Sequence, residues 1–211
     1  MPDFAFESVH WSAGRRVVAG VDEAGRGPLA GPVVAGAVVL PEAFQHAWLN
    51  DSKKLPAPRR EALYEELTGD GRIRFASGMA SVEEIDRLNI LRATHLAMGR
   101  AVAALGEPRP EMVLIDGLPV RDFAWPQQAV VKGDALSLSI AAASIIAKVE
   151  RDRLMLALDA AFPLYQFAAH KGYGTAAHLA ALQQYGPSPH HRRSFQPVAQ
   201  LSLDFSGGAP A

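Results

Sequence analysis

Residues 17–40, VVAGVDEAGRGPLAGPVVAGAVVL, decide the fold, because this stretch begins and ends in apolar runs and places two acids between them. Residues 17–21 are mostly β-branched and precede a glycine-rich turn, so they predict a buried strand. Residues 33–40 predict the next strand of the same sheet. Asp22 and Glu23 then stand at the mouth of a buried strand, where an isolated carboxylate is costly unless it is paired, protonated or bound to a metal.

Further apolar runs and caps predict strands alternating with helices. Ser81 and Glu84 match the capping-box pattern, so a helix should begin there, and Asn89 can restart it. The remaining strands are expected at 73–79, 111–115 and 129–131, and the remaining helices before residue 68, at 91–105, 135–161 and 175–185. This alternation predicts an α/β fold, with a mixed sheet flanked by helices.

Composition limits the classes of protein and site. The chain has 211 residues, a net charge of -1 and no cysteine, which excludes disulfides and thiolate metal sites. A domain that simply coats nucleic acid is usually strongly basic, so nucleic-acid binding would have to rest on local patches. No apolar run is long enough to span a membrane and the first residues do not resemble a signal peptide, so a cytoplasmic protein with no membrane contact is expected.

Three predicted strands are followed by acids or end in them: Asp22 with Glu23, Asp116, and Asp134. Strand ends at one sheet edge converge where α/β proteins build their sites, so these four acids are expected to meet. Each also has an ordinary interpretation. Asp116 before Gly117 suits a turn, Asp134 suits a helix cap worth roughly 1 kcal/mol, and neighbouring residues of a strand point to opposite faces.

The chemistry of the set favours a metal site. Carboxylates without histidine or cysteine partners suit Mg²⁺ or Mn²⁺, which prefer oxygen ligands. Two such ions can activate a water and stabilise the leaving oxygen of a phosphodiester. Metal and phosphate chemistry therefore explain the four acids better than stability does.

Beyond these acids, the chain carries a series of motifs: DEAGRGP at 22–28, DSKKL at 51–55, EID at 84–86, LIDG at 114–117, KGD at 132–134, AASIIAK at 142–148, HKGY at 170–173 and HHRRSF at 190–195. Together they resemble type 2 ribonuclease H, the bacterial ribonuclease HII. The resemblance covers about residues 17–197 in order, so chance similarity is implausible.

The resemblance implies a ribonuclease H-like fold with a C-terminal helical region and metal-dependent cleavage of RNA. The expected substrates are RNA/DNA hybrids and duplex DNA with an embedded ribonucleotide, cut on the 5′ side to leave a 3′-hydroxyl and a 5′-phosphate. It also implies that Asp22, Glu23, Asp116 and Asp134 bind the metal, in agreement with the pattern of strand ends. The expected cofactor is Mn²⁺ or Mg²⁺.

Substrate recognition requires contact with a 2′-hydroxyl, the group that separates RNA from DNA. By the resemblance, the segment Gly25, Arg26 and Gly27 contacts the ribonucleotide, and Tyr173 stacks on the sugar at the junction. Glycines allow close approach of the backbone to a ribose. The alternatives are a plain tight turn and a half-buried aromatic side chain.

Several polar residues are candidates for substrate phosphate contacts. Ser144, Lys148 and Asp152 share one helical face, so Lys148 either contacts phosphate or pairs with Asp152. Lys53, with Lys54, lies in a loop beside the predicted anion site. The basic run 190–193 is equally ambiguous, and His170 is expected to make a structural hydrogen bond.

The expected domain organisation is an extension at 1–16, a catalytic domain at 17–197 and a tail at 198–211. The tail contains QLSLDF at 200–205, from Gln200 to Phe205, which resembles the short motif that binds the bacterial sliding clamp. A last strand packing its apolar residues on the core is the alternative. A monomer is expected.

Two other functions fit the sequence less well. Type 3 ribonuclease H is disfavoured because about 16 residues precede the first strand, too few for the extra N-terminal domain of that family. A protein that binds hybrids without cutting them would lack one of the metal acids, and none is missing. Repair of ribonucleotides in DNA is therefore the predicted function.

Overall fold

The computed structural model describes residues 1–46, 48–49, 52 and 55–201, and a five-stranded mixed sheet forms the centre of this part. The sheet order is β3-β2-β1-β4-β5. Its strands are β1 (Val18–Ala24), β2 (Val33–Val39), β3 (Arg74–Ala80), β4 (Met112–Asp116) and β5 (Gln127–Val130). β1, β2 and β3 pair antiparallel, whereas β4 runs parallel to both β1 and β5. The predicted α/β class with a mixed sheet is confirmed.

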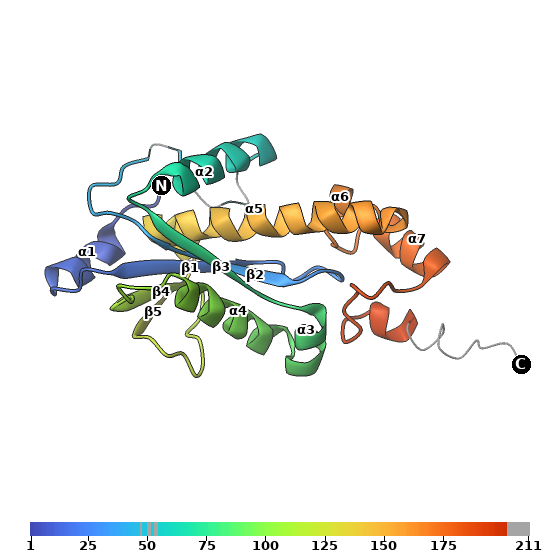
Figure 1. Cartoon of the computed structure of the whole chain (residues 1–211). Coiled ribbons are helices and arrows are strands. Elements are labelled where there is room, and N and C mark those ends of the chain that lie inside the picture. The colour runs from blue at the N-terminus through green and yellow to red at the C-terminus, as the bar shows by residue number, and fades with distance from the viewer. Residues whose placement is uncertain (47, 50–51, 53–54, 202–211) are drawn as a thin grey trace, which may run out of the picture.

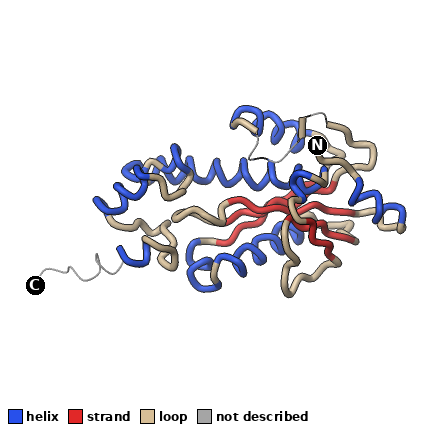
Figure 2. Tube along the Cα trace, turned by 180° about the vertical axis from the view of Figure 1, so that it is seen from behind, coloured by secondary structure: helices blue, strands red, loops and turns tan. Residues whose placement is uncertain are grey.

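Helices cover both faces of the sheet (Figures 1 and 2). α5 lies along one face and α4 along the other, while the short helices α6 and α7 form a C-terminal helical region beyond the strands (Figure 1). The helices are α1 (Ala5–Ser12), α2 (Ala57–Gly69), α3 (Val82–Leu88), α4 (Ile90–Ala104), α5 (Leu138–Ala161), α6 (Phe167–His170) and α7 (Ala176–Tyr185), with single 3₁₀ turns η2 (Gly133–Ala135) and η3 (Pro163–Tyr165).

Two glycines let α5 approach the centre of the sheet. A Cβ on Gly20 of β1 would lie 2.2 Å from the carbonyl carbon of Ser139, and one on Gly36 of β2 would lie 2.4 Å from the carbonyl oxygen of Ala143. Any larger residue would therefore push the helix off the sheet. Gly36 is also the β2 partner of Asp22, so one of these two close helix–sheet contacts lies beside the acid.

The predicted helix starts are confirmed at two positions and wrong at a third. Ser81 and Glu84 form the reciprocal capping box that begins α3, and Asn89 caps α4 from a left-handed conformation. The long helix, however, begins at Leu138 rather than at residue 135, and Ser137 is its N-cap. Asp134 instead lies in the preceding 3₁₀ turn, so its interpretation as a helix cap is wrong.

The N-terminal segment packs against the turn that carries Asp134. Asp3 pairs with this turn through a β-bridge to Ser137 and backbone hydrogen bonds to Leu136 and Leu138. Glu7 of α1 is fully buried, and its Oε1 accepts hydrogen bonds from the Ser137 hydroxyl at 2.6 Å and the Ser139 N–H at 3.0 Å. These contacts tie the first residues of the chain to the start of α5.

Glu7→Ala is expected to lower the free energy of unfolding by about 2 kcal/mol, because it leaves the Ser137 hydroxyl and the Ser139 N–H buried without an acceptor. Urea denaturation measures this loss. Glu7→Gln keeps an acceptor oxygen of the same reach and should stay close to the parent protein. Equal losses in the two variants would show that side-chain packing, and not the two hydrogen bonds, carries the effect.

In the described residues, no helix combines the length and apolar character needed to cross a lipid bilayer. Residues 198–201 are helical, and Leu201 packs against the cluster around Phe167 and Leu182. The alternative of a last strand is therefore wrong for the start of the tail, and residues 202–205 of the clamp-like motif lie outside the described residues. The boundaries at 16/17 and 197/198 stay a prediction.

Candidate active site

Three carboxylates converge at the carboxyl ends of the parallel strands. Asp22 lies in β1, Asp116 ends β4, and Asp134 lies in η2 after β5. Val21 of β1 is opposite Ile115 of β4, so the acids that follow them stand at the same level of the sheet. One carboxylate oxygen from each of the three acids lies within 4.8 Å of the other two.

The local backbone holds these carboxylates. Asp22 and Asp134 are only 3% and 8% exposed. The N–H of Glu23 donates to Oδ1 of Asp22, and the N–H of Gly133 donates to Oδ1 of Asp116, both at 2.7 Å. The second bond also links Asp116 of β4 to the turn that carries Asp134.

Glu23 reaches the site from the other face of the sheet. β1 continues to Ala24, so Asp22 and Glu23 point to opposite faces, with Gly20 and Asp22 on the α5 side. Glu23 lines a pocket of about 130 Å³ together with Asp116 and residues of α4. Its Oε1 also pairs with the Arg26 guanidinium at 3.3 Å. The structure thus groups three of the four predicted acids and places the fourth beside Asp116.

The residues fit a hard divalent cation. The three grouped side chains offer only carboxylate oxygens, and no imidazole belongs to this group. Oxygen ligands at this spacing suit Mg²⁺ or Mn²⁺. Two largely buried acids beside a third repel one another strongly, and a bound cation would relieve that repulsion. The donor set therefore favours a metal centre.

Two buried arginines hold the loop that follows β1. Arg192 is 0% exposed and donates to the carbonyls of Gly25, Arg26 and Gly31 at 2.6–3.0 Å. Arg151, 1% exposed, donates to the carbonyls of Ala30, Pro32 and Lys171. Burial, and next the charge of Arg151, lower the pKa of Arg192 to about 9. These bonds fix the path of the predicted ribonucleotide-binding segment.

Gly25 and Gly27 have different physical roles. Gly25 has a φ of +98°, and a Cβ there would lie 1.9 Å from Nε of Arg151, so only glycine fits. Gly27 is exposed, and a Cβ there would lie 3.5 Å from the ring of Tyr173. Tyr173 is itself 47% exposed. The structure therefore brings the glycine segment and the predicted stacking tyrosine together on an open surface.

A chain of buried histidines supports the segment that carries Tyr173. Nδ1 of His178 lies 2.9 Å from the Tyr173 carbonyl, so it must carry the proton that it donates there. Nε2 of His178 then accepts from Nε2 of His191 at 2.9 Å, and Nδ1 of His191 accepts from the Ser188 N–H. His170 donates to the Tyr165 carbonyl, which confirms its predicted structural hydrogen bond. This bonding pattern uses neutral imidazoles throughout.

The free energy of unfolding should therefore fall in acid. Burial, and next the His178 side chain, lower the pKa of His191 from 6.5 to about 3, and burial also lowers the pKa of His178. The unfolded chain then binds more protons, so stability is full above pH 6.5. It decreases by up to about 1.4 kcal/mol per pH unit for His191 as the pH falls toward 3. Urea denaturation at several pH values measures this slope.

His191→Gln should flatten the slope between pH 6.5 and 4, although it also lowers stability at pH 7 because Ser188 and His178 lose a partner. His46→Gln removes a histidine that pairs with Glu66 elsewhere and serves as the matched control. An unchanged slope in His191→Gln would contradict the assignment of acid sensitivity to the buried histidine chain.

The candidate phosphate ligands lie in different settings. Ser144 is 2% exposed and bridges α5 to Ser52 through its hydroxyl, which also donates to the Ala141 carbonyl. Lys148 pairs with Asp152 at 2.6 Å, and burial lowers its pKa. Both interactions are structural in this state. Lys53 and Lys54 lie outside the described residues.

The burial of three residues that support the site was not predicted from the sequence. The basic run 190–193 gave no sign that Arg192 would be wholly buried, and Arg151 lies in an ordinary helical pattern. Glu7 belongs to a segment without clear periodicity. Burial at these positions depends on partners more than 100 residues away in sequence, which no local pattern encodes.

Comparison with known proteins agrees with this geometry. The family model described as ribonuclease HII matches residues 19–198. A ribonuclease HII from Paracoccus denitrificans is 57% identical over 202 residues, which cover 95% of this chain and 94% of that protein.

Solved structures show the same arrangement. The ribonuclease H2 of Pyrococcus horikoshii matches with a TM-score of 0.72 and 28% identity, over 90% of this chain and 99% of that one. Ribonuclease HII of Archaeoglobus fulgidus, solved as a complex with PCNA, matches with a TM-score of 0.71 and 26% identity, over 85% and 95% of the two chains. The chain therefore belongs to the ribonuclease HII family.

Proposed function

We propose that this ribonuclease H cuts on the 5′ side of a ribonucleotide, both in RNA/DNA hybrids and at single ribonucleotides embedded in duplex DNA, and so serves their removal. The products would be a 3′-hydroxyl and a 5′-phosphate. The observation that supports the proposal is the cluster of three carboxylates at the end of β1, which is followed directly in sequence by the exposed turn whose Gly27 lies close to the Tyr173 ring.

The four acids would hold the metal. Asp22, Asp116 and Asp134 present oxygens within 4.8 Å of one another, and Glu23 would join them from the pocket that it shares with Asp116. When bound, Mg²⁺ or Mn²⁺ supplies Lewis-acid stabilisation for the charge that develops on the phosphate oxygens. The hydrogen bonds from Glu23 N–H and Gly133 N–H orient two of the carboxylates toward that site.

The segment Gly25, Arg26 and Gly27 would select ribose. Arg192 donates hydrogen bonds to the carbonyls of Gly25 and Arg26, so the backbone of this segment is fixed before substrate binds. A prearranged backbone distinguishes a 2′-hydroxyl with little loss of conformational entropy. Arg26 pairs with Glu23, and this contact would bring the ribose close to one of the proposed metal ligands.

Tyr173 would stack on the sugar at the junction. Tyr173→Ala is expected to reduce cleavage at a single embedded ribonucleotide by about 10- to 100-fold, which is the usual value of one aromatic stacking contact. Its stability should change little because the side chain is half exposed. Tyr173→Phe keeps the ring and should retain most activity. Parallel loss of unfolding free energy and cleavage in Tyr173→Ala would contradict the stacking role.

The decisive experiment uses the intact chain with two matched duplexes, one carrying a single ribonucleotide and the other entirely DNA. With Mg²⁺ or Mn²⁺, only the first should be cut, at one position on the 5′ side of the ribonucleotide. A control reaction with EDTA should yield no product. No cleavage of the ribonucleotide-containing duplex, or equal cleavage of both duplexes, would overturn the proposal.

A sliding clamp is a further proposed partner. Support comes from the motif at 200–205 and from the relative solved in complex with PCNA. Removal of residues 200–211 should abolish binding to the clamp in a surface-binding assay and leave cleavage of a short duplex intact. Unchanged affinity would refute this role. The enzyme is further proposed to be cytoplasmic and monomeric and to make no contact with a membrane.

A further inference from the structure

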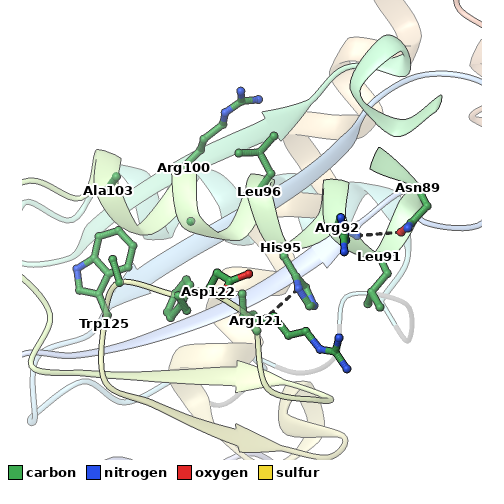
Figure 3. A pocket seen from close by; sticks show the side chains of 14 residues that line it. Asn89, Leu91, Arg92, His95, Leu96, Arg100, Ala103, Arg121, Asp122 and Trp125 are labelled. Carbon is green, nitrogen blue, oxygen red and sulfur yellow. Dashed lines mark hydrogen bonds between the residues drawn. The ribbon is translucent and has the colours of Figure 1, made fainter. Parts of the chain in front are cut away.

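A long groove runs along α4, opposite the face that carries α5. It has a volume of about 730 Å³ and is formed by α4 and the segment that joins β4 to β5 (Figure 3). Arg92 and His95 lie on its helical wall, and Arg121, Asp122 and Trp125 lie on the opposite wall. We propose that this groove binds the sugar–phosphate backbone of the substrate duplex on one side of the cut, an inference that rests on the proposed nuclease function.

The groove is continuous with the candidate active site. Leu91 and His95 line both the groove and the small pocket that contains Glu23 and Asp116. Leu91 is 46% exposed at this passage. A nucleic-acid strand that leaves the catalytic pocket past Leu91 and His95 would therefore enter the groove.

The charges of the groove fit a phosphate backbone. Arg92 and Arg121 are exposed, and neither makes an ion pair with a described carboxylate, whereas exposed arginines such as Arg72 and Arg109 do. Asp122 is the acid among the lining residues. The chain as a whole has a net charge of -1, so these unpaired cations form a local basic patch rather than part of a generally basic surface. Such patches supply phosphate contacts that position a duplex.

His95 is oriented at the passage between the two cavities. The backbone N–H of Arg121 donates to its Nδ1 at 3.3 Å, as Figure 3 shows. Burial, followed by the charges of Arg26 and Arg121, lowers the pKa of His95 and favours the neutral ring. With Nδ1 acting as acceptor, the proton lies on Nε2, which becomes a neutral hydrogen-bond donor beside the path of the backbone.

Trp125 and Phe123 close the far end of the groove. Their rings pack together with centroids 5.1 Å apart, and both rest against the core cluster under α4. This anchors the segment that carries Arg121, so the two walls are held by packing rather than formed by a free loop. A fixed wall reduces the entropy lost when a phosphate binds Arg121.

Charge reversal tests the groove directly. Arg92→Glu and Arg121→Glu should each raise the substrate concentration that gives half-maximal single-turnover cleavage by about tenfold, the value of one charged hydrogen bond. The rate at saturating substrate should stay unchanged, because neither residue touches the acids. Each change should also reduce the slope of log affinity against log salt by about 1. Arg109→Glu, a matched control before β4 at the opposite strand end, should behave like the parent chain.

Duplex length provides the second arm. The same variants are compared on a long ribonucleotide-containing duplex and on two duplexes cut short on one side of the ribonucleotide. Truncation on the side that enters the groove should remove the difference between variant and parent, and truncation on the other side should preserve it. Both side chains are exposed, so the unfolding temperature should change by no more than about 2 °C.

The outcomes separate this proposal from the proposed function. If the parent chain cuts the duplex and the charge reversals leave half-maximal concentration and salt slope unchanged, the groove does not bind substrate although the nuclease function stands. If the variants lower only the saturated rate, the groove proposal also fails. Absence of cleavage by the parent chain would instead refute the proposed function.

Discussion

Asp22→Asn is expected to reduce metal-dependent cleavage by at least about a thousandfold, which corresponds to a loss of about 4 kcal/mol of transition-state stabilisation. Asparagine keeps the size of the side chain but removes the charge that holds a divalent cation. The neighbouring acids, Asp116 and Asp134, lie within 4.8 Å, and the Gly133 N–H holds the Asp116 carboxylate in place, so neither acid substitutes for the lost charge. Single-turnover cleavage of a duplex with one ribonucleotide measures the change.

Mn²⁺ is expected to raise the unfolding temperature of the parent chain, since a ligand that binds only the folded state stabilises it. The same variant should lose this rise. Asp70→Asn, which removes an exposed acid paired with Arg72, is the matched control and should retain both properties. Cleavage by Asp22→Asn at the parent rate would refute the assignment of the metal site.

Arg192→Met should lower the free energy of unfolding by about 3 kcal/mol or more. The arginine is fully buried, and its removal leaves the carbonyls of Gly25, Arg26 and Gly31 without hydrogen-bond donors. Bulk water does not reach this buried position to replace the guanidinium. The preference for ribose should fall as well, because the loop loses the bonds that fix its path. Urea denaturation and the ratio of cleavage at one ribonucleotide to cleavage of all-DNA duplex report the two effects.

Arg193→Met supplies the control for this experiment, because the neighbouring side chain is exposed and its backbone N–H, which bonds Asp86, is retained. It should change stability by less than about 0.5 kcal/mol. If both variants were equally stable, the guanidinium bonds of Arg192 would not hold the loop. If Arg192→Met lost stability but kept its ribose preference, the loop path would not determine selectivity.

Local pattern predicted the strands, the capping box at Ser81 and the acids at the strand ends, because each of these signals depends on residues close in sequence. The predicted start of α5 was wrong by three residues: Ser137 caps the helix, and its hydroxyl also donates to Glu7 of α1, a partner 130 residues away that no local pattern encodes. The sequence predicted that Asp22 and Glu23 point to opposite faces of the sheet, because side chains alternate along a strand. It did not predict which helix covers each face, so the surroundings of Glu23 could not be inferred. The burial of Arg151 and Arg192 depends on carbonyls over 100 residues distant.

The parallel pairing of β1 with β4 has a consequence for the order of synthesis. Asp22 leaves the ribosome with the first hairpin, but Asp116 and the turn carrying Asp134 emerge later, 112 residues after Asp22 in the second case. At 5–20 residues per second, this interval is about 6–22 s. A nascent chain therefore carries an incomplete set of these carboxylates for most of its synthesis. A nuclease made beside messenger and ribosomal RNA gains its proposed metal ligands as a set only when about two-thirds of the chain exists.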